Sequence, residues 1–265
     1  MKLLNGETKI FPIMGDPIAQ VRSPEHLTAI LHNKGENGIV PPMHVSPENF
    51  QDAVITCRKT HNIHGIVITI PHKIPALNVC DRVSERAAFV GSVNIIRKQS
   101  NGELYGDNVD GIGYMDGVAK EGYQVTGQRA LLIGAGGAGS AVAYEILKRG
   151  ADYLAIFDVD EARLSSLIQR LEKEFPGKVG TGSQDPTGFD FVANVTPVGM
   201  RAGDPYPVDV TKLNADQFIA DAITKPEVSP MVEHARSLGC KTMTGAGMFN
   251  AEAEILVDFM LQDHE

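Results

Sequence analysis

The feature that most constrains this chain is a glycine-rich segment in its middle. Three glycines follow the spacing Gly134-x-Gly136-x-x-Gly139, directly after a strand-like segment at residues 129–133 that is apolar from Ala130 onward. They precede residues 140–149, whose composition favours a helix. Glycines at these points allow a tight turn, and they let the backbone approach a dinucleotide pyrophosphate at the N-terminus of the helix. The segment therefore predicts a Rossmann-type nucleotide-binding domain, with contacts from Gly134, Ala135, Gly136, Gly137, Ala138 and Gly139.

The acidic residue after the next predicted strand indicates which dinucleotide is bound. Asp158 lies 24 residues beyond the first glycine of the segment, close to the position where a carboxylate accepts hydrogen bonds from the adenosine ribose. Such a carboxylate repels a 2′-phosphate, and Asp160 adds negative charge, so NAD is expected in preference to NADP. Arg163 is a contrary sign; alternatively, it lies on a solvated helix face where Glu161 partly neutralises it.

Strand-like and helix-like segments alternate along the chain, which predicts an α/β fold. We expect strands at residues 9–15, 39–45, 64–70, 92–98, 104–105, 129–133, 153–158, 189–195 and 218–222. We expect helices at residues 23–34, 140–149, 161–175 and 248–262. We also expect a helix that starts near residue 47, one that ends at residue 89 and one that starts near residue 110. Ser23 is predicted to cap the first of these helices, with Pro24 as its first residue. The change of motif near residues 108–125 predicts a boundary between two domains, residues 1–110 and 111–245.

Composition argues against several classes of partner. The net charge of -9 and the pI near 5.4 argue against nucleic acid or an anionic membrane surface. No apolar run approaches the roughly 20 residues of a membrane span, and the N-terminus lacks a signal-peptide core, so a cytoplasmic protein is expected. The histidines predict no metal site. Three cysteines without a Cys-x-x-Cys pair predict reduced thiols packed as small core residues: Cys57, Cys80 and Cys240.

Four short stretches outside the glycine-rich domain carry a specific combination of residues. They are Gly15-Asp-Pro-Ile-Ala-Gln-Val-Arg-Ser-Pro24, Thr69-Ile-Pro-His-Lys73, Gly91-Ser-Val-Asn94 and Gly106-Asp-Asn-Val-Asp-Gly111. A fifth stretch, Asn194-Val-Thr-Pro-Val-Gly-Met200, lies in the nucleotide domain. In this order and spacing the stretches resemble the shikimate and quinate dehydrogenase family over nearly the whole chain.

The resemblance implies an NAD(P)-dependent oxidoreductase that acts on a CH–OH group. It implies that residues 1–110 bind a cyclic polyol carboxylate and carry the catalytic groups, and that residues 246–265 return to pack on this domain. It also implies that the second domain holds the nicotinamide. By the same resemblance Lys73 and Asp110 form the catalytic pair. The remaining implied contacts are Ser23, Thr69 and Asn94 for the substrate and Thr196, Met200 and Gly245 for the cofactor.

The chemistry explains why a lysine and an aspartate are wanted. Oxidising a secondary alcohol requires a proton acceptor at the hydroxyl while hydride leaves the carbon, and reduction requires the reverse. A lysine accepts a proton only when it is partly deprotonated, so burial should lower the pKa of Lys73 while Asp110 opposes that effect. Taken alone, Lys73 could be a solvated residue and Asp110 a helix N-cap. His72, between Pro71 and Lys73, is interpreted as a packed ring rather than a proton relay.

Four positions depart from the family pattern, because each has a side chain with different hydrogen-bonding groups from the residue that is usual there. Val21 replaces a residue whose hydroxyl usually binds the substrate carboxylate, and Val67 replaces an asparagine. Thr224 replaces a tyrosine, and Glu252 replaces a glutamine. A missing hydrogen bond to a charged group is worth about 1.5–3 kcal/mol, so shikimate should bind more weakly unless Arg22 compensates. Glu252 favours a ligand amine or neutral donor over a second carboxylate. Alternatively, the match of this sequence to the family pattern is shifted by one residue near Glu252, or the Glu252 side chain is exposed to solvent.

Three main hypotheses about function remain open at this point, and a folate or amino-acid dehydrogenase of similar two-domain architecture is a weaker alternative that leaves the four N-terminal stretches unexplained. The first is an NAD-dependent dehydrogenase of a shikimate-like or quinate-like acid, and the second is an aminoshikimate-type dehydrogenase, which Glu252 suggests. The third is a non-catalytic, NAD-binding regulatory protein, which the intact Lys73, Asn94 and Asp110 argue against. The exact substrate, the physiological direction and the oligomeric state, including a homodimer, stay undetermined.

Overall fold

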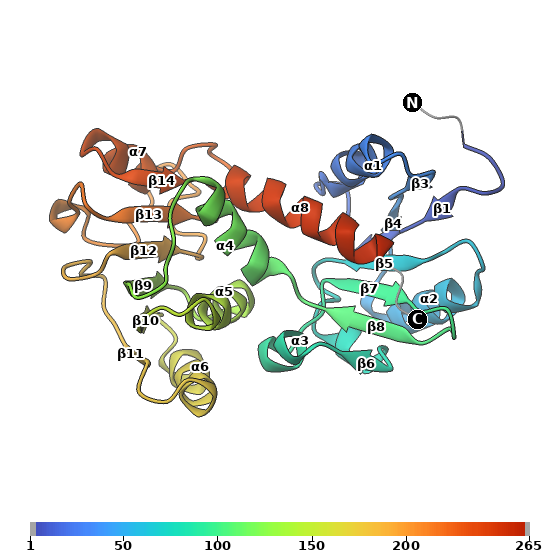
Figure 1. The fold of residues 1–265 in the computed structure, drawn as a ribbon, viewed down its shortest axis with the longest axis horizontal. Helices are drawn as coiled ribbons and strands as arrows, with labels where there is room; N and C mark the ends of the chain where they lie inside the picture. Colours follow the sequence, from blue (N-terminus) through green and yellow to red (C-terminus); the bar gives the residue numbers. More distant parts are fainter. Residues whose placement is uncertain (1–3, 263–265) are drawn as a thin grey trace. The chain divides into compact units, whose positions relative to one another are not determined.

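The computed structural model describes residues 4–262 of the chain. The chain divides into two compact units, each considered by itself (Figure 1). Unit 1 contains the described residues up to Val109 and those from Ala253 onward, and unit 2 is Asp110–Glu252. No helix within residues 4–262 is both long enough and apolar enough to cross a membrane.

Unit 1 is built on a mixed sheet with the strand order β4-β2-β5-β7-β8-β6. Its strands are β2 (Ile13–Gly15), β4 (Pro42–His44), β5 (Gly65–Ile68), β6 (Arg82–Val83), β7 (Ile95–Lys98) and β8 (Leu104–Asp107). Strand β5 is parallel to β2 and antiparallel to β7. A separate pair of parallel strands is formed by β1 (Lys9–Ile10) and β3 (Gly38–Ile39).

Helices cover both faces of this sheet. The helical segments are α1 (Ser23–Asn33), η1 (Pro47–Asn49), α2 (Phe50–Lys59), η2 (Pro75–Asn78), α3 (Glu85–Val90) and the second half of α8 (Gly245–Leu261). Because successive strand residues point to opposite faces, Val67 packs in one core cluster with side chains of α1 and α8. Its neighbours Ile66 and Ile68 pack in the other cluster with side chains of α2 and α3. The C-terminal helix therefore returns to the first unit, as predicted.

Unit 2 contains a parallel six-stranded sheet. Its strands are β9 (Arg129–Ile133), β10 (Tyr153–Phe157), β11 (Val179–Thr181), β12 (Phe191–Asn194), β13 (Phe218–Asp221) and β14 (Lys241–Met243). Its helical segments are α4 (Asp110–Lys120), α5 (Gly137–Lys148), α6 (Glu161–Glu174), η3 (Val210–Lys212), α7 (Pro230–Ser237) and the first half of α8. The order β11-β10-β9-β12-β13-β14 is 3-2-1-4-5-6 when counted from β9, which is the dinucleotide-binding arrangement. The predicted α/β class with a Rossmann-type unit is confirmed.

Several predicted elements need correction. The strand expected at residues 9–15 is divided into β1 and β2, and the helix expected up to residue 89 is interrupted by β6 before α3 begins. Helix α1 begins at Ser23 itself, after Arg22 as N-cap, and no side chain caps it, so the predicted Ser23 cap is wrong. Helix α5 begins three residues earlier than expected, because the second half of the glycine segment is already helical.

Candidate active site

The glycine-rich segment forms the turn between β9 and α5. Gly134 has a φ of +112°, which favours glycine, and a Cβ on Gly139 would lie 2.1 Å from the carbonyl oxygen of Gly134. A Cβ on Gly136 or Gly137 would meet no atom within 4 Å, so the loop faces open space there. The N-cap Gly136 has no side chain with which to cap the helix, which leaves first-turn N–H groups to bind an anion. The loop fits a dinucleotide pyrophosphate.

Asp158 lies beside this loop, one residue after β10. Its Oδ2 accepts a hydrogen bond from the Ala135 N–H at 2.7 Å, and its Oδ1 accepts one from the Asp160 N–H at 2.8 Å. Its side chain is only 7% exposed. Arg163 Nη2 lies 3.3 Å from Asp160 Oδ2, and its Nη1 lies 3.9 Å from Asp158 Oδ2. Arg163 is thus paired with Asp158 and Asp160, and not with Glu161 as the sequence had suggested.

A buried polar network holds the carboxyl ends of β12 and β13, on the other side of the glycine loop. Asn194 Oδ1 accepts hydrogen bonds from the backbone N–H and the hydroxyl of Thr196, and Asn194 Nδ2 donates to Asp221 Oδ1 at 3.1 Å. Ser229 Oγ donates to Asp221 Oδ2 at 2.6 Å. Burial raises the pKa of Asp221 to about 6, although these hydrogen bonds oppose the rise. A Cβ on Gly134 would lie 2.9 Å from Thr196 Cγ2, so the network positions Thr196 against the glycine loop.

The other predicted cofactor residues also lie at this end of the sheet. Met200 is 48% exposed, in a loop whose backbone Asp204 holds through the N–H groups of Gly199 and Arg201. Gly245 is the first residue of α8, and its N–H donates to the carbonyl of Ile223, just beyond β13.

In unit 1, three predicted site residues meet where β5 ends. Thr69 follows β5, and its N–H donates to the carbonyl of Met14 on β2. Asn94 precedes β7, and its carbonyl accepts the N–H of Ile68 at 2.8 Å. The Lys73 carbonyl accepts the N–H of Val93 at 2.8 Å, which fixes the backbone of the lysine next to Asn94. Thr69, Lys73 and Asn94 therefore belong to one edge of the sheet, as a shared site requires.

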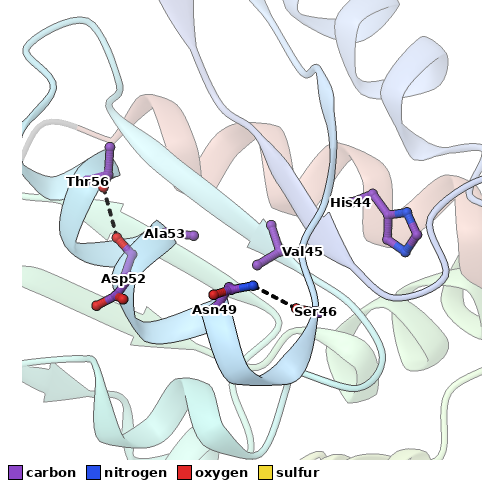
Figure 2. A pocket seen from close by; sticks show the side chains of 7 residues that line it. All are labelled: His44, Val45, Ser46, Asn49, Asp52, Ala53 and Thr56. Carbon is purple, nitrogen blue, oxygen red and sulfur yellow. Dashed lines mark hydrogen bonds between the residues drawn. The ribbon is translucent and has the colours of Figure 1, made fainter.

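His72 fastens the loop that carries Lys73. Its ring is fully buried and stacks on Phe50 with 4.4 Å between centroids, and its Nε2 donates to the Val45 carbonyl at 2.7 Å. The packed-ring interpretation of His72 agrees with this environment. On the outer side of Val45 lies a hollow of about 430 Å³, shown in Figure 2. None of the predicted site residues lines that hollow, which is formed by His44, Val45, Ser46, Asn49, Asp52, Ala53 and Thr56.

Asn94 also connects this edge to the chain segment before Asp110. Its Oδ1 accepts the N–H of Val109 at 3.0 Å. Asp110 is the first residue of α4 in unit 2 and is 7% exposed. Three residues further along α4, a Cβ on Gly113 would lie 2.6 Å from the Cβ of Glu252, which is half-buried on α8. Within unit 2, Glu252 therefore packs against the helix that Asp110 begins.

Two of the four departures from the family pattern share one environment. Val67 is 4% exposed and belongs to the core cluster of α1 and α8, and Val21 packs against the same cluster. Ser23 is half-buried at the start of α1. Thr224, a third departure, is exposed beyond β13. Val67 is thus a core residue and Val21 packs against the same core, where polar side chains were expected from the resemblance.

Comparison with known proteins identifies the family. The model of the shikimate dehydrogenase substrate binding domain matches residues 13–96. A shikimate dehydrogenase (NADP(+)) of Methanocaldococcus jannaschii is 33% identical over 252 residues, which cover 93% of this chain and 89% of the relative. The chain belongs to the shikimate dehydrogenase family. The predicted enzyme class, a nicotinamide-dependent oxidoreductase that acts on a CH–OH group, is confirmed with it.

Solved structures agree with this membership of the shikimate dehydrogenase family. A shikimate dehydrogenase in complex with NADP+ has a TM-score of 0.90 and 27% identity, covering 98% of this chain and 92% of its own. The ligand-free 5-ketofructose reductase of Gluconobacter sp. strain CHM43 also has a TM-score of 0.90, with 26% identity and coverage of 98% and 96%. The same fold thus occurs in proteins named for different substrates.

Sequence reasoning missed the network around Asp221 and Ser229 in this family member. One signal was available, because Asn194 and Asp221 each end an apolar strand, and the carboxyl ends of neighbouring parallel strands lie together. Among the described residues, no group of three His, Cys, Asp or Glu side chains could hold a metal ion.

Proposed function

We propose that this member of the family is an NAD(H)-dependent dehydrogenase of a shikimate-like or quinate-like cyclic hydroxy acid. The observation that carries the proposal is the position of the Asp158 carboxylate, which binds the N–H of Ala135 in the glycine loop. A carboxylate fixed beside that loop suits the ribose of NAD, whose hydroxyls donate hydrogen bonds.

Charge around Asp158 supports NAD over NADP. An ionised carboxylate has about four acceptor positions, and the backbone uses two of them, so two remain for ribose hydroxyls. A 2′-phosphate would meet this carboxylate and Asp160. Arg163 lies against both aspartates and so offsets their charge instead of presenting an unopposed cation to a phosphate. The preference rests on this chain's own residues, since the relative from Methanocaldococcus jannaschii is named for NADP(+).

We assign the substrate to unit 1 and the cofactor to unit 2. Thr69 and Asn94, at the carboxyl end of β5, would donate to or accept from substrate hydroxyls, and Ser23 would contribute to the carboxylate site. In unit 2 the glycine loop, Asp158, Thr196, Met200 and Gly245 would hold the dinucleotide. Glu252, half-buried on α8, is a proposed substrate contact that belongs to unit 2.

Lys73 and Asp110 would manage the proton. NAD supplies the hydride acceptor when it is bound. In the oxidative direction the neutral amine of Lys73 would take the hydroxyl proton as the carbon–oxygen double bond forms, and Asp110 would stabilise the resulting ammonium. The buried His72 ring and the hydrogen bond from the Val93 N–H hold the backbone on either side of the lysine side chain. This would keep the Lys73 amine in reach of the substrate at little entropic cost.

The apolar packing of Val21 and Val67 bears on which substrate is preferred. With one hydroxyl contact missing at Val21, the substrate carboxylate would be held less strongly than the family pattern provides. Shikimate itself should therefore bind weakly, and an acid with a different substituent pattern, including an aminated one facing Glu252, should compete with it.

A second candidate substrate is a neutral polyol ketone. The observation that favours it is the packing of Val21 and Val67 in one apolar cluster, because a substrate without a carboxylate has no need of the polar groups that they replace. The 5-ketofructose reductase described above shows that this fold can serve such a substrate.

The three cysteines are free thiols, which supports the proposed cytoplasmic location. A homodimer also belongs to the proposal, and sedimentation at several protein concentrations would test it.

The experiment is a steady-state scan of the purified protein. NADH absorbance would be followed at alkaline pH with shikimate, quinate and aminoshikimate, and NADH oxidation would be followed with 5-ketofructose. Turnover of one of the acids with NAD supports the leading proposal, and turnover of 5-ketofructose alone supports the second. A protein that binds NADH and turns over none of them contradicts both, and the regulatory hypothesis then takes their place.

A further inference from the structure

A buried ion pair ties β8 to the start of α3 within unit 1. Asp107 is the last residue of β8 and is 2% exposed, and Arg86 is the second residue of α3 and is half-buried. The Arg86 guanidinium donates from Nε to Asp107 Oδ1 at 2.8 Å and from Nη2 to Asp107 Oδ2. Figure 1 shows α3 beside β8. The pair is thus bidentate, a geometry that adds both strength and directional specificity.

The carboxylate of Asp107 also receives two other donors. Its Oδ1 accepts the hydroxyl of Ser84, which is the N-cap of α3, and the N–H of Asn108 at 2.7 Å. Together with the guanidinium, four donors surround the buried carboxylate, which matches the number of acceptor positions that it has. Arg86 supplies the positive charge in this set and half of the donors. Removing such a cation is strongly destabilising, because the charge of the buried carboxylate is then uncompensated.

Asp107 and the two residues after it are joined to the segment that contains Asn94. The N–H of Asn94 donates to the carbonyl of Asp107 at 2.9 Å, and the N–H of Val109 donates to Asn94 Oδ1 at 3.0 Å. Between them, Asn108 Nδ2 donates to Ser92 Oγ at 3.0 Å. Three hydrogen bonds therefore fix the two segments to each other, and one of them holds the side-chain amide of Asn94.

The contact with Val109 determines which way the Asn94 amide faces. The Val109 N–H is a donor, so it bonds to the oxygen of the amide and not to the nitrogen, which is itself a donor. A shift of the Val109 backbone would therefore release the amide to rotate. Val109 is fully buried and follows Asp107 by two residues, so its position depends on the contacts that hold Asp107.

We propose that the ion pair of Arg86 and Asp107 is a positioning pair, which orients the Asn94 amide toward a hydroxyl of the substrate. This inference rests on the proposed function, in which Asn94 binds the substrate. Neither member of the pair needs to contact the substrate, because the effect reaches Asn94 through Val109. Without the guanidinium, the buried carboxylate would move toward solvent, and the backbone of the residues that follow it would move as well.

The test compares Arg86→Gln with Arg82→Gln, which removes an exposed arginine from β6 in the same unit. Steady-state rates would be measured with NAD and the cyclic hydroxy acid that the wild type oxidises fastest. In Arg86→Gln the KM for the acid should rise by about tenfold, the effect of losing one hydrogen bond to the substrate, while the KM for NAD changes less than twofold. Arg82→Gln should match the wild type.

Arg86→Lys keeps the positive charge but loses the bidentate geometry, so it should raise the KM for the acid by only about threefold. This partial rescue is expected of a positioning pair. The same variant carries the test if Arg86→Gln does not fold.

A second readout needs no turnover. Hydrogen exchange of the Val109 amide would be measured in the free, full-length protein, with the Val67 amide as reference, because Val67 lies on β5 and its N–H donates to the Pro12 carbonyl at 2.9 Å. In Arg86→Gln the Val109 amide should exchange at least tenfold faster than in the wild type, and the Val67 amide should be nearly unchanged. Equal acceleration of both amides, or none at Val109, would overturn the proposal.

The two readouts separate this inference from the proposed function. If the wild type oxidises no cyclic hydroxy acid, the proposed function fails, whereas selective exchange at Val109 still supports the positioning of Asn94. If the wild type oxidises an acid and Arg86→Gln keeps the wild-type KM for it, the proposed function stands and the positioning role is disproved.

Discussion

The cofactor preference should depend on the charge of Asp158, and Asp158→Asn is the substitution that isolates it. Asparagine preserves the size of the side chain and one acceptor oxygen, so one of the two backbone hydrogen bonds, from Ala135 or Asp160, can be kept. It removes the charge that would face a 2′-phosphate, and it leaves Arg163 opposed by Asp160 alone. The variant should therefore gain NADP use while losing some NAD use.

The size of this change can be worked from the charges. A carboxylate about 5 Å from a phosphate of charge about -1.5, in an effective dielectric of about 40, is repelled by about 2.5 kcal/mol. Loss of one acceptor for a ribose hydroxyl weakens NAD by about 1 kcal/mol. Together the ratio of kcat/KM for NAD to that for NADP should fall by on the order of a hundredfold or more.

The assay compares initial rates with NAD and NADP at a fixed concentration of the best alcohol substrate, for the wild type and the variant. Glu161→Gln is the matched control, because it removes an exposed negative charge from the first residue of α6, three positions after Asp158. It should change the ratio little. A ratio in Asp158→Asn within about threefold of the wild type would refute the argument, since it would show that Asp158 does not face the ribose.

Three further results follow from the site. Lys73→Ala should lower kcat by about two orders of magnitude or more while the affinity for NADH stays nearly unchanged; equal loss of NADH binding, measured by fluorescence titration, would disprove the assignment. His72→Phe keeps the stacking on Phe50 but leaves the buried Val45 carbonyl unpaired. The free energy of unfolding, measured with urea, should therefore fall by about 1–3 kcal/mol, and kcat should be reduced more than KM is changed. An unchanged free energy of unfolding would contradict the role of His72 in holding this loop. The third result concerns Asp221, whose pKa is raised in the folded state from 3.8 to about 6. The protonated Asp221 therefore contributes fully to the free energy of unfolding below pH 3.8, and this contribution is lost as the pH rises through 6. The unfolding free energy of the wild type minus that of Asp221→Asn should fall by about 2.5 kcal/mol between pH 4 and 7. Parallel stability curves for the two proteins would disagree with a buried, titrating carboxyl.

The Rossmann-type unit could be predicted because its signals are local. The glycine spacing, the apolar strand before it and Asp158 lie within 30 residues, and each has a direct backbone consequence in the turn between β9 and α5. Strands β11 and β14 were missed because each has three residues at or near an edge of the sheet, which is too short for a periodic pattern. Helix α7 was missed although Ser229 caps it and Pro230 is its first residue, which is an ordinary helix start signal.

The positions of side chains were less accessible to sequence reasoning. Asn194 and Asp221 are 27 residues apart and meet only because β12 and β13 are neighbours in the sheet. The role of His72 depends on Val45, which is equally distant in the sequence. Such contacts follow from strand order, and strand order is not a local property.

The proposed NAD dependence of this chain can be measured on the wild-type enzyme itself. The ratio of kcat/KM for NAD to that for NADP should be determined for the wild-type enzyme with whichever cyclic hydroxy acid it oxidises fastest. We expect a ratio of about ten or more, because Asp158 would accept hydrogen bonds from the ribose and repel a 2′-phosphate. A ratio below one would contradict it, and would mean that Arg163 rather than Asp158 determines which cofactor is bound.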